Sequence, residues 1–176
     1  GRGVIVNALG TSAVRSMAVA GTAAGSVAVS LSASVPVITM DTKASVGNGV
    51  EINKMAGVAA DDAQSLTVAA ASDVYVLGFS GAVAIGGSVG GGAGVNAAVV
   101  DTKTRAIVGT SDVAAQGNVS VSSKASEDFA IWAVAGAGGG VAALAGSGSA
   151  VDLTTETTAT LGGKVVAQGN VDVIAD

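Results

Sequence analysis

The chain repeats itself, and this self-similarity constrains its fold more than any other feature. A short stretch of alternating aliphatic residues, here called an opening, occurs four times. The openings lie at residues 4–6, 66–68, 119–121 and 171–173, so they are 62, 53 and 52 residues apart. Repeats of this length are typical of solenoids, propellers and other arrays. The sequence therefore predicts units at residues 4–65, 66–118 and 119–170, with a fourth starting at 171–176.

Each unit also carries a bulky side chain thirteen residues after the start of its opening. These residues are Met17, Phe79 and Trp132. Stacked units bring equivalent residues side by side on neighbouring strands. We therefore expect the three side chains to form a ladder in the core or at a corner of the array.

An acidic residue ends the long apolar stretch of each unit. These residues are Asp41, Asp101 and Asp152. We expect them at equivalent positions near a corner. Stacking would then bring like charges together unless Lys43, Lys103 or water offsets the repulsion.

Within each unit the hydrophobic pattern has a period of two, which indicates β-strands. From residue 27 to residue 37 the odd positions are Val, Leu or Ala, and the even positions up to 34 are Ala or Ser. The apolar residues are mainly Ala and Val, there are 27 glycines, and aromatic residues make up only 2%. Such small side chains favour flat sheets at short separation. The glycine clusters at 90–92 and 138–140 predict a corner, a bulge or a very close contact between sheets.

These patterns predict an all-β repeat solenoid with units of about 52–62 residues. Each unit could make one large coil or two smaller ones. The first unit contains Pro36 and an insertion around residues 53–62, and we expect strict stacking to fail there. The whole chain, 1–176, is expected to be one solenoid segment and an excerpt of a longer protein.

Composition argues against several functions. The chain lacks Cys and His, which removes thiolate metal sites and the commonest general base. Its net charge of −5, without a basic stripe, disfavours nucleic acid as a partner. We expect no catalytic, cofactor-binding or metal-binding residues.

Two acidic pairs could suggest calcium sites, at Asp61-Asp62 and Glu127-Asp128. The Gly-Gly-x-Gly-x-Asp repeat of calcium-binding β-rolls is absent, so we interpret both pairs as solvated turns. The glycine-rich run at 86–92 is not followed by the Lys-Ser/Thr of a phosphate-binding loop.

Three uncharged stretches, between Arg15 and Asp41, Asp73 and Asp101, and Asp128 and Asp152, are long enough to cross a bilayer as helices. Their Gly and Ser content and the period of two argue against that, so we expect no membrane span.

The segment at residues 159–175 resembles a rung of the filamentous haemagglutinin-like adhesins. It is also similar to the leukotoxin-type large repetitive adhesins and the autotransporter passengers of Gram-negative bacteria. The likeness lies in a small-residue strand, a Gly turn, an Ala-x-Gly-Asn corner at 167–170 and a Val-x-Val strand at 171–173. It implies a right-handed parallel β-helix that is secreted or displayed on the cell surface, with no active residues.

We therefore expect a structural or adhesive segment of an extracellular bacterial fibre or surface adhesin, not an enzyme. Its main partner would be itself, through neighbouring repeats or copies in a filament. The alternative is a module that binds a glycan or a host protein on one solenoid face.

Overall fold

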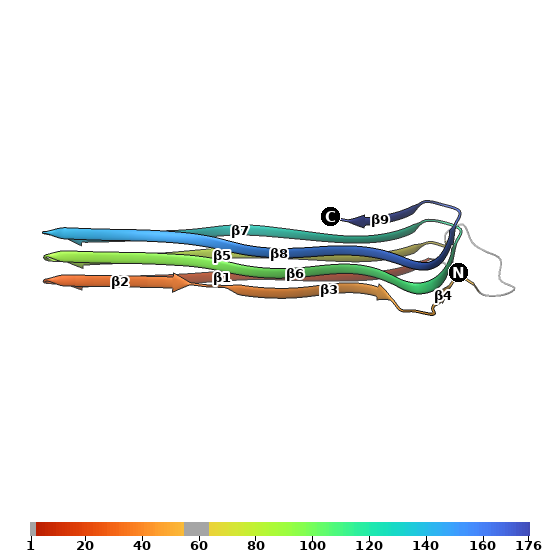
Figure 1. Cartoon of the computed structure of the whole chain (residues 1–176), viewed down its shortest axis with the longest axis horizontal. Helices are drawn as coiled ribbons and strands as arrows, with labels where there is room; N and C mark the ends of the chain where they lie inside the picture. Colours follow the sequence, from red (N-terminus) through yellow and green to blue (C-terminus); the bar gives the residue numbers. More distant parts are fainter. Residues whose placement is uncertain (1–2, 55–63) are drawn as a thin grey trace.

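The computed structural model describes residues 3–54 and 64–176, and its regular structure there is entirely β (Figure 1). The strands are β1 (Val4–Ala24), β2 (Val27–Ser34), β3 (Val37–Val46), β4 (Glu51–Ile52), β5 (Leu66–Gly86), β6 (Val89–Ala115), β7 (Val119–Gly139), β8 (Ala142–Ala167) and β9 (Val171–Ala175).

The strands form two parallel sheets. The first has the order β1-β5-β7-β9, and in the second β6 lies between β8 on one side and β2, β3 and β4 on the other. Each unit runs out along the first sheet, turns, and runs back along the second (Figure 1). A unit is therefore one large coil of two long strand paths. The predicted all-β solenoid is confirmed.

The coils have short turns at one end and longer connections at the other. The tip is the end with the short turns at residues 25–26, 87–88 and 140–141, drawn at the left of Figure 1. The base is the opposite end, where each unit opens. The half of each coil near the tip is called the tip half, and the other the base half.

Successive coils stack in the register that the repeat predicts. Val4 pairs with Leu66, Leu66 with Val119, and Val119 with Val171. Met17, Phe79 and Trp132 likewise lie on one rung, which confirms that they form a ladder.

The expectation that Pro36 disturbs the stacking is wrong. Ser34 pairs with Asn96 before the proline and Val37 with Val99 after it, so the register does not change. Proline cannot donate a backbone hydrogen bond, which interrupts the ladder between β2 and β3. Its carbonyl still accepts a bond from the Val99 N–H at 3.0 Å. The missing donor lies on the same side as this carbonyl and faces β6, so the proline removes one ladder bond and pairing resumes at Val37.

The insertion expected around residues 53–62 falls mostly on residues 55–63, which lie outside the described part of the chain. On its two sides the stacking is regular. Ile52 pairs with Val113 before it, and Leu66 pairs with Val119 after it.

The acidic residues that end the apolar stretches are not stacked, contrary to expectation. Asp101 is paired with Thr39 and Thr154, and Asp152 with Val99. From one coil to the next, each acidic residue lies two residues away from the position that pairs with the acidic residue of the preceding coil. The like-charge repulsion that stacking would produce is thereby avoided.

The base half has an ordinary aliphatic core between the two sheets. Leu66, Val68, Val108, Val119 and Val121 are fully buried there and belong to one cluster. A second cluster, around Val74, Val76 and Val100, continues it toward the middle of the coil. Burial of these rows supplies most of the hydrophobic stabilisation of the coil.

The tip half is packed differently, because its interior is lined by very small residues. A Cβ atom added to Gly90 would collide with the carbonyl of Gly138, and one on Gly92 with the carbonyl of Gly136. The backbones of the two sheets therefore lie in close contact, and only glycine fits at these positions. This confirms the close sheet contact predicted from the glycine clusters.

Candidate functional surface

The tip half presents its large apolar side chains to the outside. On β2 the buried row is Ala28, Ser30, Ser32 and Ser34, and the outward row contains Val29 and Leu31. Val29 is 71% exposed and Leu31 is 68% exposed. The same inversion occurs on the other strands. Exposed aliphatic residues of the tip half are Val19, Val27, Val83, Ile85, Val95, Val134, Val141 and Leu144.

The ladder of Met17, Phe79 and Trp132 is part of this outer face. Met17 is 77% exposed and Trp132 is 56% exposed. The prediction that the ladder lies in the core or at a corner is therefore wrong, because the three residues lie within strands on the outer face. Large rings and thioethers do not fit between sheets whose backbones touch, so they point outward.

Some polar groups inside the tip half form hydrogen bonds across the narrow gap, whereas Ser30 Oγ and Asn96 Oδ1 have no protein partner among the described residues. The hydroxyls of Ser32 and Ser80 are 2.9 Å apart, and both side chains are buried. Asn96, also buried, donates from Nδ2 to the carbonyl oxygen of Trp132 at 3.2 Å. Buried polar groups with partners cost little, whereas unpaired ones are destabilising. The tip half thus has a polar, small-residue interior and an apolar exterior.

Charged residues stop where the apolar exterior starts. Along the first sheet Arg15, Asp73 and Asp128 are the last charged residues before the tip, and none follows on β1, β5 or β7. On the second sheet the first charges after the tip are Asp41, Asp101 and Asp152.

The outer face of the base half carries a ladder of alternating charge. Asp41, Lys103 and Glu156 share one rung, and Arg105 on the next outward rung reaches back to Asp41. Its Nη2 donates to Oδ2 of Asp41 at 2.5 Å. This hydrogen bond, with the attraction of the same carboxylate, raises the pKa of Arg105. Alternating signs stabilise neighbouring strands where like charges would separate them.

A second ion pair ties the end of the first unit to the second coil. Lys54 Nζ donates to Oδ2 of Asp112 at 2.5 Å. The hydrogen bond holds the pKa of Asp112 below its usual value. Both side chains remain partly exposed, so the ion pair connects the two coils at the base without burying a charge.

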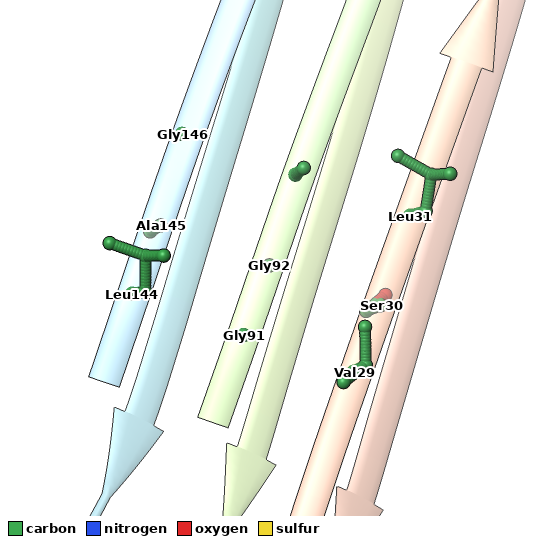
Figure 2. Close-up of a pocket in the computed structure, with 9 residues that line it drawn as sticks. Val29, Ser30, Leu31, Gly91, Gly92, Leu144, Ala145 and Gly146 are labelled. Atoms are coloured by element: carbon green, nitrogen blue, oxygen red, sulfur yellow. The ribbon is translucent and has the colours of Figure 1, made fainter. Parts of the chain in front are cut away.

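A shallow groove of about 460 Å³ crosses the outer face of the tip half on the second sheet (Figure 2). Val29 and Leu31 on β2 form one wall, and Leu144 on β8 forms the other (Figure 2). The floor is Gly91 and Ala93 of β6. The groove exists because these floor residues are small while the strands on both sides carry aliphatic side chains. Its lining offers almost no groups for hydrogen bonds.

Of the two acidic pairs singled out in the sequence, only Glu127-Asp128 lies in the described part of the chain. Asp61 and Asp62 lie outside the described residues. Glu127 and Asp128 lie within strand β7, so the interpretation as a turn is wrong for this pair. Glu127 accepts a hydrogen bond from the hydroxyl of Thr155 at 3.0 Å. Among the described residues, no group of three or more acidic, His or Cys side chains is placed to hold a metal ion.

Residues 3–54 and 64–176 contain no helix of the length and apolar character needed to cross a membrane. Comparisons of the chain with models of protein families, with curated proteins and with solved structures found no match.

Proposed function

We propose that this chain is a structural or adhesive segment of an extracellular bacterial fibre or surface adhesin, which works by stacking coils into a rod. The observation that carries the proposal is the parallel register from coil to coil, which shifts by one residue between Val108 and Ser111 of β6 and is otherwise continuous in these pairings. In such an array each coil is stabilised chiefly by its neighbours, so the structure extends along one axis.

The edges of both sheets support this proposal. Within residues 3–54 and 64–176, the one strand neighbour of β1 is β5, and β2 and β3 pair only with β6. On the other side of this described part, β8 pairs only with β6, and β9 covers β7 from Val119 to Ser123. Unpaired backbone groups along such edges are ready to bond to another strand. We infer that a further coil, or a second copy, covers them.

A proline on the free edge tests self-association. The N–H of Val4 donates to the carbonyl of Ser65 on the β5 side. Because N–H groups alternate in direction along a strand, the N–H of Ala13 points away from β5. Ala13→Pro should therefore remove a donor that a second copy would use, while the bonds of β1 to β5 persist. Ala13→Val keeps the donor and is the matched control.

We expect the original chain and Ala13→Val to form elongated assemblies whose length increases with concentration. Ala13→Pro should shorten them markedly. Electron microscopy and sedimentation velocity measure both. A chain that remains monomeric at all concentrations, or assemblies that the proline leaves unchanged, would contradict association through this edge.

A second candidate function is recognition of a glycan on the first sheet. It is motivated by the rung of Met17, Phe79 and Trp132 on the outer face, in which Met17 and Trp132 are exposed, since aromatic faces pack against apolar sugar surfaces. Quenching or enhancement of Trp132 fluorescence by soluble bacterial or host glycans would support it. The apolar groove of Figure 2 does not, because it has few partners for sugar hydroxyls.

A further inference from the structure

The apolar exterior of the tip half has no partner among the described residues, although it covers both sheets. On the first sheet it includes Met17, Val19 and Ile85, and on the second Val29, Leu31 and Leu144. Exposed apolar patches much larger than a few hundred Å² mark surfaces that contact something else. We call this surface the apolar band.

The length of the band is comparable to that of a lipid hydrocarbon layer. β5 has no charge from Val74 to Gly86, about 43 Å at ~3.3 Å per residue, and the part from the aromatic rung at Phe79 to Gly86 is about 26 Å long. The hydrocarbon core of a bilayer is ~30 Å thick, so it would cover the strands from the tip to about the aromatic rung. The charged rungs start at the base side of the band, where they would lie in water or among lipid headgroups.

The exposed aromatic residues lie at one border of the band. Tyr75, Phe79 and Trp132 are three of the four aromatic side chains in the chain, and all three lie on the outer face of the first sheet. Phe79 and Trp132 share a rung, and Tyr75 is opposite Asp128. Tyr and Trp collect where hydrocarbon meets headgroups, because their rings are apolar and their polar atoms need water.

The backbone at the tip is suited to an apolar surrounding. Ser88 N donates to the carbonyl of Ser26 at 2.8 Å, and Val141 N donates to the carbonyl of Ser88 at 2.9 Å. The tip turns thus bond to one another from coil to coil, as the strands do. Lipid tolerates backbone only where its polar groups are satisfied within the protein, so the free edges of β1, β2, β7 and β8 need a further coil or copy beside them.

A second copy of the chain fits this surface less well than lipid does. The apolar band lies on the outer faces of both sheets, which point in opposite directions. A flat partner could contact only one of these faces. Covering both by protein would require layer upon layer of copies. A lipid phase covers both sheets and the tip at once.

We propose that the tip half enters a lipid bilayer, with the apolar band in hydrocarbon, the aromatic border at the headgroups and the charged base half in water. Because all tips lie on one side of the stack (Figure 1), a longer rod would lie along the membrane with one side immersed. The proposal differs from the sequence-based expectation of no membrane span, because the outward apolar rows of the tip half enter one side of the bilayer. This proposal rests on the proposed stacking of coils, because the free edges of the first and last coils must be covered before the tip half can enter hydrocarbon.

Trp132 is the only tryptophan and reports directly on the border of the band. The purified chain is mixed with phosphatidylcholine vesicles and separated by flotation, and the Trp132 emission is recorded. We expect the protein to float with the vesicles and its emission to move to shorter wavelength. Lipids with a quencher near the headgroup should quench it more strongly than lipids with a quencher at the chain end.

Leu31→Lys tests the band itself, and Ser45→Lys on the exposed outer face of the base half is the matched control. A lysine at hydrocarbon depth should weaken partitioning into vesicles by about a hundredfold. The control should partition like the original chain. Circular dichroism checks that both variants keep their strands.

Failure of the chain to float would overturn the proposal, and so would equal partitioning of the two lysine variants. The proposal is also overturned if the emission of Trp132 moves to shorter wavelength without lipid and vesicles change nothing, because a second copy would then cover the band. The edge-association proposal is judged separately by the length of assemblies in the absence of vesicles.

Discussion

The inverted packing of the tip half predicts that one substitution has very different costs in the two halves of a coil. Leu66 is fully buried in the core of the base half, whereas Leu31 is 68% exposed in the apolar band. Leu66→Ala should destabilise the chain by about 2–5 kcal/mol, because the loss of burial is added to a cavity. Full burial of a leucine is worth ~1.5–3 kcal/mol, and only about a third of Leu31 is buried, so Leu31→Ala should cost less than about 1 kcal/mol.

The measurement is equilibrium unfolding in urea, followed by circular dichroism without lipid and at a concentration below that of assembly. The two variants should share the slope of the original chain and differ in midpoint. Equal destabilisation by both substitutions would refute the inverted packing. If the cost of Leu31→Ala rises with protein concentration, copies rather than water cover the band in solution.

Three further predictions concern the interior and the base. Gly90→Val should destabilise the chain by at least ~1–3 kcal/mol because it collides with the carbonyl of the facing sheet, whereas Gly91→Val, which points outward, should change urea stability little. In a double-mutant cycle, alanine at Ser32 and Ser80 should give a coupling of about 0.5–1.5 kcal/mol for their buried hydrogen bond, and no coupling would contradict that bond. Because the folded pKa of Asp112 lies below its unfolded value, its ion pair stabilises the fold above the unfolded pKa and is lost as the pH falls through the folded pKa. The thermal midpoint of Asp112→Asn should therefore differ from that of the original chain near neutral pH and converge with it under acid, while a constant difference would contradict the assignment.

The stacking of the units could be predicted from the sequence because equivalent residues recur at a regular spacing and pair with one another in the structure. The openings at 4, 66, 119 and 171 are paired in the structure at the predicted spacing. The acidic residues were a weaker guide. A charge can occupy any outward position near the end of an apolar stretch, and repulsion favours the staggered arrangement.

The direction of the two faces in the tip half was not predicted, since alternation alone does not say which row is inside. A signal for it exists in the comparison of the units. One rung contains Ala20, Ala82 and Ala135, so this inward position is uniformly small. The neighbouring outward rung contains Gly21, Val83 and Gly136. Uniformly small residues indicate a space limit, whereas variable size indicates a position without one.

The base corner after β4 has a consequence for how such a protein can be altered. The first coil contains more residues there than the second, yet Ile52 and Leu66 on either side both keep their partners in the next coil. Lengthening the chain at this corner therefore leaves every rung in place. The corner is a natural point for grafting a foreign peptide, which each added copy of the coil would display at a fixed interval along the rod.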